Sequence, residues 1–236
     1  MSKISDRLQT VQCVIQETCA RAGRSVEELT LIVVTKSTTI EAIQEVLELG
    51  FTNLGENHVL QLKKVCTEVG NLSNNGRPAP SINWHMIGHL QRNKVNQVLP
   101  LASLIHSVDT LRLAEGISAS ATRLNRTANV LLQVNTSNEP QKYGVPVGAA
   151  THLAEQLETL PNLTLKGVMT MAPLTRNKEV VRGCFARAKD LFDEMRGERI
   201  VGPSFTELSM GMSSDYEIAI EEGATLLRIG SAIFAG

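Results

Sequence analysis

The sequence alternates between short runs that favour β-strands and longer segments that favour amphipathic helices. Several of the β-like runs are apolar at nearly every position, as strands buried on both faces of a parallel sheet are. An alternation of this kind predicts an α/β fold in which helices join parallel strands. Eight such runs occur in order along the 236 residues, at LTLIVVT, FTNLGE, INWHMIG, SLIHSVD, NVLLQVN, LTLKGVMTM, FTELSMG and TLLRIG.

The segments between the runs carry an apolar stripe and a polar remainder, as helices that cover a sheet should. Apolar residues at helical spacing also precede the first strand, in a segment that stops near Gly23 and predicts one additional helix. The stripe of this first helix consists of Ile4, Leu8, Val11 and Ile15. Further helices are predicted over residues 40–50, 59–70, 111–124, 153–160 and 181–195.

Eight strands alternating with helices suggest a (β/α)₈ barrel, the TIM barrel, with an extra N-terminal helix, since that fold typically takes about 250 residues. A doubly wound open sheet is the alternative, and the number of strands favours the barrel. The stretch 70–83 is rich in Gly, Asn, Pro and Ser and could mark a domain boundary. The same rhythm continues on both sides of it, so we expect a surface loop and a single domain over residues 1–236.

The composition argues against several classes of partner. The chain has 23 basic and 24 acidic residues, a net charge of -1, and 42% of its residues are hydrophobic. Binding to a nucleic-acid backbone normally needs a clustered excess of Lys and Arg, so we expect no nucleic acid as a partner. No segment approaches the run of about 18 apolar residues needed to span a membrane, and the N-terminus lacks the apolar core of a signal peptide. We therefore expect a cytoplasmic protein without a membrane partner.

The four cysteines have the spacing of neither a zinc site nor a disulfide framework. Cys13, Cys19, Cys66 and Cys184 contain no C-x-x-C pair, and three of them fall at apolar-compatible positions of helix-like segments. Free thiols in a reducing compartment are the expectation.

The residues that close each strand are the candidates for function, because the functional face of a parallel barrel lies at the carboxyl ends of its strands. In this sequence those positions are polar or small and chemically diverse. They are Lys36, Gly55 to Asn57, His85 to His89, Ser107 to Asp109, Asn135, Met169 to Met171, Ser209 to Ser213, and Arg228 to Ser231.

The last two strands run into loops suited to a phosphate. In LSMGMSSDYEIAIEEGA, Ser214 and Glu217 have the spacing of a capping box at a helix start. In RIGSAIFAG, Gly230 allows a close approach of the backbone, and Ser231 offers a hydroxyl and an amide. Loops after the last two strands of this fold commonly bind phosphate. Serine and glycine also serve as plain cap and turn residues, but two such loops in adjacent positions favour phosphate binding.

Lys36 follows the apolar run of the first strand. Desolvation or a nearby cation could destabilise its ammonium form and make a nucleophilic amine available for a carbonyl group. Arg228 ends the last strand, which lies beside the first in a closed barrel, and it could be that cation. Alternatively, Lys36 extends into solvent at the end of a strand, and its position alone favours this simpler interpretation.

Other catalytic or metal-binding patterns are weak. His85 and His89 are four residues apart, but HMIGH leaves a strand through a glycine and does not lie on a helix, so a zinc pair is not expected. We find neither a Ser-His-Asp nor a Cys-His arrangement, and we assign no catalytic residue and no metal.

Seven stretches form a combination that extends in order over almost the whole chain. They are TKSTTIEAI, LGENHVLQLKKV, INWHMIGHLQRNK, IHSVDTLRLA, LLQVNTSNEPQKYGV, LKGVMTMAP and LSMGMSSDYEIAIEEGATLLRIGSAIFAG. This combination resembles the pyridoxal phosphate homeostasis protein family, also called the YggS or PROSC family. The part MGMSSDYEIAIEEGATLLRIG is especially specific to it.

The resemblance implies a fold like the N-terminal barrel of alanine racemase, with pyridoxal 5'-phosphate (PLP) bound as a Schiff base, an internal aldimine, to Lys36. It further implies that Arg228 faces the pyridine nitrogen. The remaining implied cofactor contacts are Ser209, Gly230 and Ser231 at the phosphate with Met210 nearby, and Asn57, His85 and Met171 along the pocket.

Two positions depart from the pattern of the family. Where relatives commonly read lysine, threonine, lysine, proline, this chain reads Lys36-Ser37-Thr38-Thr39, so the contacts of the following loop are expected to differ. Ser231 stands where many relatives have threonine, which preserves the hydroxyl.

The resemblance implies a carrier of PLP that buffers and delivers the cofactor and influences vitamin B6 and amino-acid balance. A permanently protonated Arg228 opposite the ring nitrogen would weaken PLP as an electron sink, and the sequence ends at Gly236 without a second β domain to complete a racemase site. We expect a monomer that is not an enzyme, with apo forms of PLP-dependent enzymes as candidate partners. The alternatives are a PLP-dependent amino-acid racemase and a barrel enzyme that uses Lys36 on a phosphorylated metabolite.

Overall fold

A computed structural model describes residues 3–36, 38–72 and 81–235 of the chain. Ser37, in the Lys36 to Thr39 stretch that departs from the family pattern, lies outside these residues. Most of the predicted 70–83 loop does so as well. The predicted helix stop at Gly70 falls slightly early, because the helix continues to Leu72.

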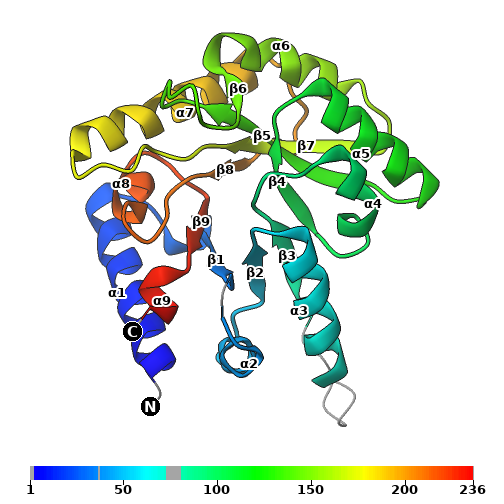
Figure 1. Cartoon of the computed structure of the whole chain (residues 1–236). Helices are drawn as coiled ribbons and strands as arrows, with labels where there is room; N and C mark the ends of the chain where they lie inside the picture. Colours follow the sequence, from blue (N-terminus) through cyan, green and yellow to red (C-terminus); the bar gives the residue numbers. More distant parts are fainter. Residues whose placement is uncertain (1–2, 37, 73–80, 236) are drawn as a thin grey trace.

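The eight predicted strands close into a parallel barrel, which Figure 1 shows with its helices on the outside. Each strand pairs with the next along the barrel, β4 pairs with β5, and β9 returns to pair with β1. The prediction of a (β/α)₈ barrel is therefore confirmed, and the open sheet is wrong. The barrel strands are β1 Thr30–Val34, β2 Asn53–Glu56, β3 Asn83–Met86, β4 Leu104–Val108, β5 Ala128–Asn135, β7 Leu163–Met169, β8 Glu207–Ser209 and β9 Leu226–Ile229.

Helices follow the strands and form the outer layer of the barrel. The extra N-terminal helix is present, and its predicted stripe is real, since Leu8, Val11 and Ile15 are buried. It packs against α8 and α9, next to the closing strand pair (Figure 1). The helices are α1 Lys3–Ala22, α2 Ile40–Glu48, α3 Val59–Leu72, α4 Val95–Val98, α5 Leu111–Arg123, α6 Val147–Glu158, α7 Lys178–Gly197, α8 Tyr216–Glu221 and α9 Ser231–Phe234, with short 3₁₀ turns η1 Val26–Glu28 and η2 Arg92–Lys94.

Two hydrophobic clusters separate the inside of the barrel from its outer layer. The larger one fills the space between the strands and the helices. The smaller one contains side chains from the neighbouring strands β1 and β9 and from β4, β5 and β7, which do not pair with them, so these side chains meet across the barrel interior. They are Ile32, Leu104, Leu131, Met169 and Leu226.

The structure adds short elements that the sequence patterns did not predict. The connection between β3 and β4 contains η2 and α4, whose sequence QRNKVNQV is mostly polar and offers only Val95 and Val98 as buried residues. A short strand, β6 Val145–Pro146, pairs with β5 outside the barrel and precedes the helix predicted over residues 153–160.

The predicted capping box at Ser214 and Glu217 is wrong. Helix α8 begins at Tyr216, with Asp215 in the N-cap position and no side-chain hydrogen bond to the helix. The Asp215 carboxylate instead accepts a hydrogen bond from the backbone N–H of Met212 at 2.6 Å. The acidic side chain therefore tightens the loop before the helix and does not cap the helix itself.

None of the helices within residues 3–36, 38–72 and 81–235 has the length and apolar content that a membrane crossing requires.

We expect Leu131→Ala to lower the free energy of unfolding by about 2–5 kcal/mol, because it opens a void in the fully buried interior cluster. Urea denaturation followed by circular dichroism measures this. Leu124→Ala is the matched control, since the Leu124 side chain is 46% exposed, and it should cost about 0.5 kcal/mol or less. Equal losses in the two variants would contradict the interior position of Leu131.

Candidate functional site

A cavity of about 1280 Å³ opens at the carboxyl ends of the barrel strands. Its wall is built from residues at or after the ends of β1, β2, β3, β5, β7, β8 and β9, so it occupies the face where function was predicted. Six of the nine predicted cofactor-binding residues line it. They are Lys36, Asn57, Met171, Arg228, Gly230 and Ser231.

Lys36 reaches the cavity because of the alternation along β1. Ile32 belongs to the interior cluster and Val34 lines the cavity, whereas Val33 packs in the outer layer. Thr35 is buried and donates a hydrogen bond to Oε1 of Glu56 at 2.5 Å, which fixes the end of β1 to the end of β2. Two residues beyond Val34, Lys36 therefore stands on the inner side of the barrel with an exposed side chain.

The position of Asn57 depends on the close approach of Gly88. A Cβ atom at Gly88 would lie 2.0 Å from the backbone oxygen of Asn57, so only glycine lets the turn after β3 approach the end of β2 this closely. Both residues line the cavity.

Arg228 provides a buried cation at the floor of the cavity. β1 and β9 pair in a register that sets Arg228 beside Ile32, which confirms that the last strand returns to the first. Its guanidinium donates to the Ser209 hydroxyl at 2.5 Å and to the Thr170 carbonyl oxygen at 2.9 Å. Burial lowers the pKa of Arg228 to about 10, against an opposing effect of Asp215. The side chain therefore remains protonated at neutral pH.

Three predicted residues do not line the cavity. Ser209 and His85 are buried below it, inside the barrel, and both take part in the hydrogen-bonded chain that includes Arg228. Met210 points the other way, into the outer hydrophobic layer, because side chains alternate along β8.

The loops after β8 and β9 meet at the cavity wall. The Ser213 hydroxyl accepts hydrogen bonds from the backbone N–H groups of Gly230 at 3.3 Å and Ala232 at 3.1 Å. A Cβ atom at Gly230 would lie 2.9 Å from the Val34 carbonyl oxygen, so glycine is needed where this turn rests on β1. Two backbone donors thus converge on one oxygen atom beside Lys36 and Arg228.

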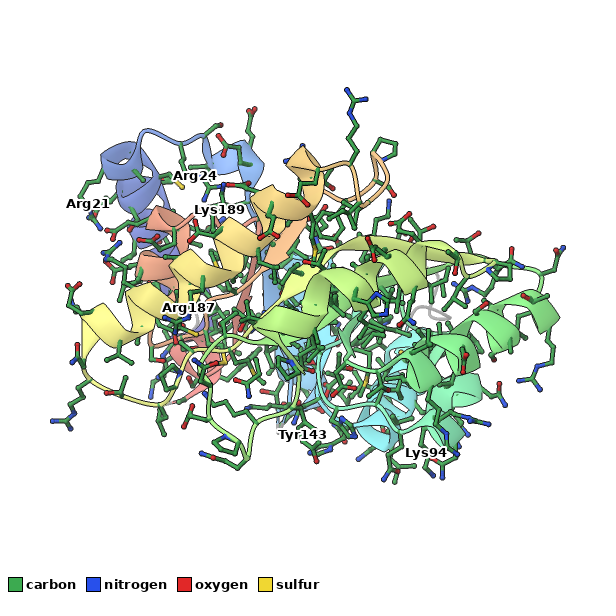
Figure 2. All side chains as sticks on the ribbon, turned by 90° about the horizontal axis from the view of Figure 1, so that it is seen from above. Arg21, Arg24, Lys94, Tyr143, Arg187 and Lys189 are labelled. Atoms are coloured by element: carbon green, nitrogen blue, oxygen red, sulfur yellow. The ribbon has the colours of Figure 1, made fainter. Side chains whose placement is uncertain are left out.

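The rim of the cavity carries exposed aromatic and apolar groups. The rings of His89 and Tyr143 are stacked with their centroids 4.0 Å apart. Tyr143 and Lys94, which both line the cavity, lie along the same edge of the molecule in Figure 2. The Leu174 side chain is fully exposed at this rim.

Several lining residues were missing from the predicted set. Ser213 belonged to a candidate strand end but was passed over in favour of Ser209, because the sequence does not tell which serine of SMGMSS lines the cavity. Gln133 ends in the barrel interior, where its amide donates to the Tyr143 carbonyl oxygen at 3.3 Å. His89 and Tyr143 come from different loops, and no local pattern pairs them.

Comparison with known proteins places the chain in a family. The family model described as "Alanine racemase, N-terminal domain" matches residues 20–236. The pyridoxal phosphate homeostasis protein of Aquifex aeolicus is 38% identical over 229 residues, which cover 97% of this chain and 96% of that protein. The protein of the same name from Escherichia coli is 35% identical over 235 residues, covering 99% and 97%.

Solved structures agree with this assignment. PipY of Synechococcus elongatus, solved with PLP bound, superposes with a TM-score of 0.83 at 30% identity and covers 98% of this chain and 100% of that one. An alanine racemase from Clostridium difficile has a TM-score of 0.69 at 14% identity, and this chain covers 56% of it. The second similarity shows the fold alone. Together with the sequence relatives, the barrel and its cavity show that the chain belongs to the family of pyridoxal phosphate homeostasis proteins.

Proposed function

We propose that the chain binds PLP as a single domain over residues 1–236, holds it covalently through Lys36, and serves in PLP homeostasis by buffering and delivering the cofactor. The observation that carries this proposal is the convergence of an amine, two backbone N–H donors and a buried cation on one cavity. PLP brings an aldehyde, a phosphate and a pyridine ring, and each of these groups has one complement in the wall.

Lys36 is the residue proposed to hold the aldehyde carbon. Its amine is exposed at the inner end of β1, on the wall that also carries Arg228 and Ser231. Lys94 is the other lysine that lines the cavity. It lies in η2, on a separate element from the phosphate loops.

The phosphate is proposed to lie at the turn formed by Gly230, Ser231 and Ala232. The Ser213 hydroxyl already occupies the converging donors of this turn, which is the position that a phosphate oxygen would take. Hydrogen bonds from N–H groups to an ionised acceptor are roughly twice as strong as those to a neutral one. The turn of Gly230 to Ala232 and the adjacent Ser213 therefore fit a phosphate better than the buried Ser209 does. Ser209 and His85 are proposed to support this site from below.

Arg228 is proposed to face the pyridine nitrogen. A guanidinium has donors only and stays protonated, so it donates to an unprotonated ring nitrogen and does not supply it with a proton. This arrangement disfavours the build-up of negative charge on the ring that carbanion chemistry requires. It supports a carrier over an amino-acid racemase, in agreement with the names of the relatives.

We further propose that the protein works as a monomer in the cytoplasm, with apo forms of PLP-dependent enzymes as recipients. In support, a single chain supplies every group assigned to PLP. All four cysteines are free thiols, and Cys13 is exposed, as suits a reducing compartment. The net charge of -1 gives no support for a nucleic-acid partner.

Lys36→Ala should abolish covalent PLP binding. Borohydride reduction of the PLP-loaded wild type should leave a mass adduct on the peptide that contains Lys36, together with loss of the visible absorbance band. The control is Lys94→Ala, which removes the other lysine of the cavity wall and should retain both signals. An adduct on Lys94, or on no lysine at all, would refute the assignment.

Gly230→Ala should weaken PLP by about tenfold or more, since the new Cβ meets the Val34 backbone and displaces a turn that holds the charged phosphate. Pyridoxal, which lacks the phosphate, should lose far less affinity. Fluorescence titration with both ligands measures the difference. Gly148→Ala is the control, because a Cβ atom there has open space around it. A parallel loss for both ligands would place the phosphate elsewhere.

The PLP-loaded protein should not exchange the α-proton of L-alanine in deuterium oxide faster than free PLP at the same concentration. The physical reason is the unprotonated ring nitrogen opposite Arg228. Nuclear magnetic resonance follows the α-deuteration. Rapid and stereospecific exchange would establish the racemase alternative instead.

A further inference from the structure

A continuous chain of hydrogen bonds runs from the cavity floor into the barrel interior. Arg228 donates to Ser209 Oγ at 2.5 Å, and Ser209 Oγ lies 2.9 Å from His106 Nδ1. His106 Nε2 lies 3.0 Å from His85 Nδ1, and His85 Nε2 lies 3.3 Å from Oδ1 of Asn53. Five residues from β2, β3, β4, β8 and β9 are thus joined in one sequence of contacts.

The donors and acceptors of this chain balance in one direction. Arg228 can only donate, so the Ser209 oxygen accepts from it and the Ser209 hydroxyl proton is free for His106 Nδ1. The His106 proton then sits on Nε2 and is donated to His85 Nδ1. His85 in turn carries its proton on Nε2 and donates to the Asn53 oxygen. The reverse direction would place two acceptors, His85 Nε2 and the Asn53 oxygen, against each other.

Burial keeps both imidazoles neutral, as this balance requires. His106 is fully buried, and its pKa lies well below the usual value because of burial, with further lowering by His85 and Arg228. Burial lowers the pKa of His85 to about 4. At neutral pH each ring therefore has one donor and one acceptor, and each holds a single tautomer.

We propose that His106, acting through Ser209, is a positioning residue that fixes the Arg228 guanidinium toward the cavity. Because the Ser209 proton is committed to His106, the Ser209 lone pairs face Arg228 and hold one of its nitrogens. The Thr170 carbonyl oxygen holds another at 2.9 Å. Two fixed acceptors define the plane of the guanidinium and leave its remaining edge for a ligand. The consequence for the cofactor rests on the proposed function, in which that edge meets the pyridine nitrogen.

The first test uses the cofactor-free protein. In ¹⁵N nuclear magnetic resonance spectra at neutral pH, His106 and His85 should both appear as neutral imidazoles with the proton on Nε2. A proton on Nδ1 of His106, or a charged ring, would overturn the proposal whether or not the protein binds PLP.

The second test compares His106→Leu with His106→Gln. The leucine variant leaves Ser209 without its acceptor, so PLP release to a scavenging apo-enzyme should become about tenfold faster. The ¹⁵N resonance of ring-labelled PLP should also shift toward the protonated form, because Arg228 no longer keeps its place. The glutamine variant retains one acceptor and one donor and should restore most of both properties. His152→Leu, which replaces an exposed histidine on α6, should behave as wild type.

The tests of the proposed function and of the positioning role can fail separately. Absence of the Lys36 adduct in wild-type protein would refute the proposed function, whereas the tautomers of His106 and His85 would still test the chain of hydrogen bonds. If His106→Leu leaves both the release rate and the ring nitrogen unchanged, or if His106→Gln fails as completely as His106→Leu does, His106 does not position Arg228. In either case the inference is overturned.

Discussion

The pairing of β1 with β9 is the contact on which the rest of the molecule depends. It joins the two ends of the sheet, so that the end of the first strand and the end of the last strand share one wall. Lys36 and Arg228 are distant in the sequence, and this pairing brings them to the wall of one cavity. Helix α1 packs against α8 and α9 over the same seam, which covers the closing strands with an additional apolar layer.

The barrel interior holds both an apolar cluster and a set of buried polar groups. The apolar cluster consists of Leu131 and its partners. The polar groups include His106, Ser209 and Arg228, which are linked to one another by hydrogen bonds. A buried charge without partners would be very costly, so the interior accepts Arg228 only because fixed acceptors surround it. The same acceptors determine the direction in which the cation can serve a ligand.

The sequence was informative wherever a feature repeats locally. Strand runs and helical stripes predicted the barrel, and the strand ends predicted the face that carries the cavity, including Lys36 and Arg228. The resemblance to the family was needed to assign PLP.

Features that depend on register or on side-chain direction were not predictable. Ser213 and Ser209 lie in the same short segment, and only the folded path of the loop after β8 shows that Ser213 lines the cavity while Ser209 is buried below it. The contact between His85 and His106 joins the neighbouring strands β3 and β4 and depends on their register, which no spacing in the sequence encodes. The capping box failed for a similar reason, because helix α8 begins at Tyr216 with Asp215, and not Ser214, in the N-cap position.

The Ser213 hydroxyl has a consequence for how tightly an anion can be held. The Gly230 and Ala232 amides donate to Ser213 within the chain itself, so a phosphate bound at this turn would exchange one set of hydrogen bonds for another. The net gain would be only the difference between a charged and a neutral acceptor. Because the chain supplies its own acceptor for these donors, the turn does not rely on a ligand to satisfy them. On the proposed function, such an exchange suits a reversible store better than a permanent catalytic anchor.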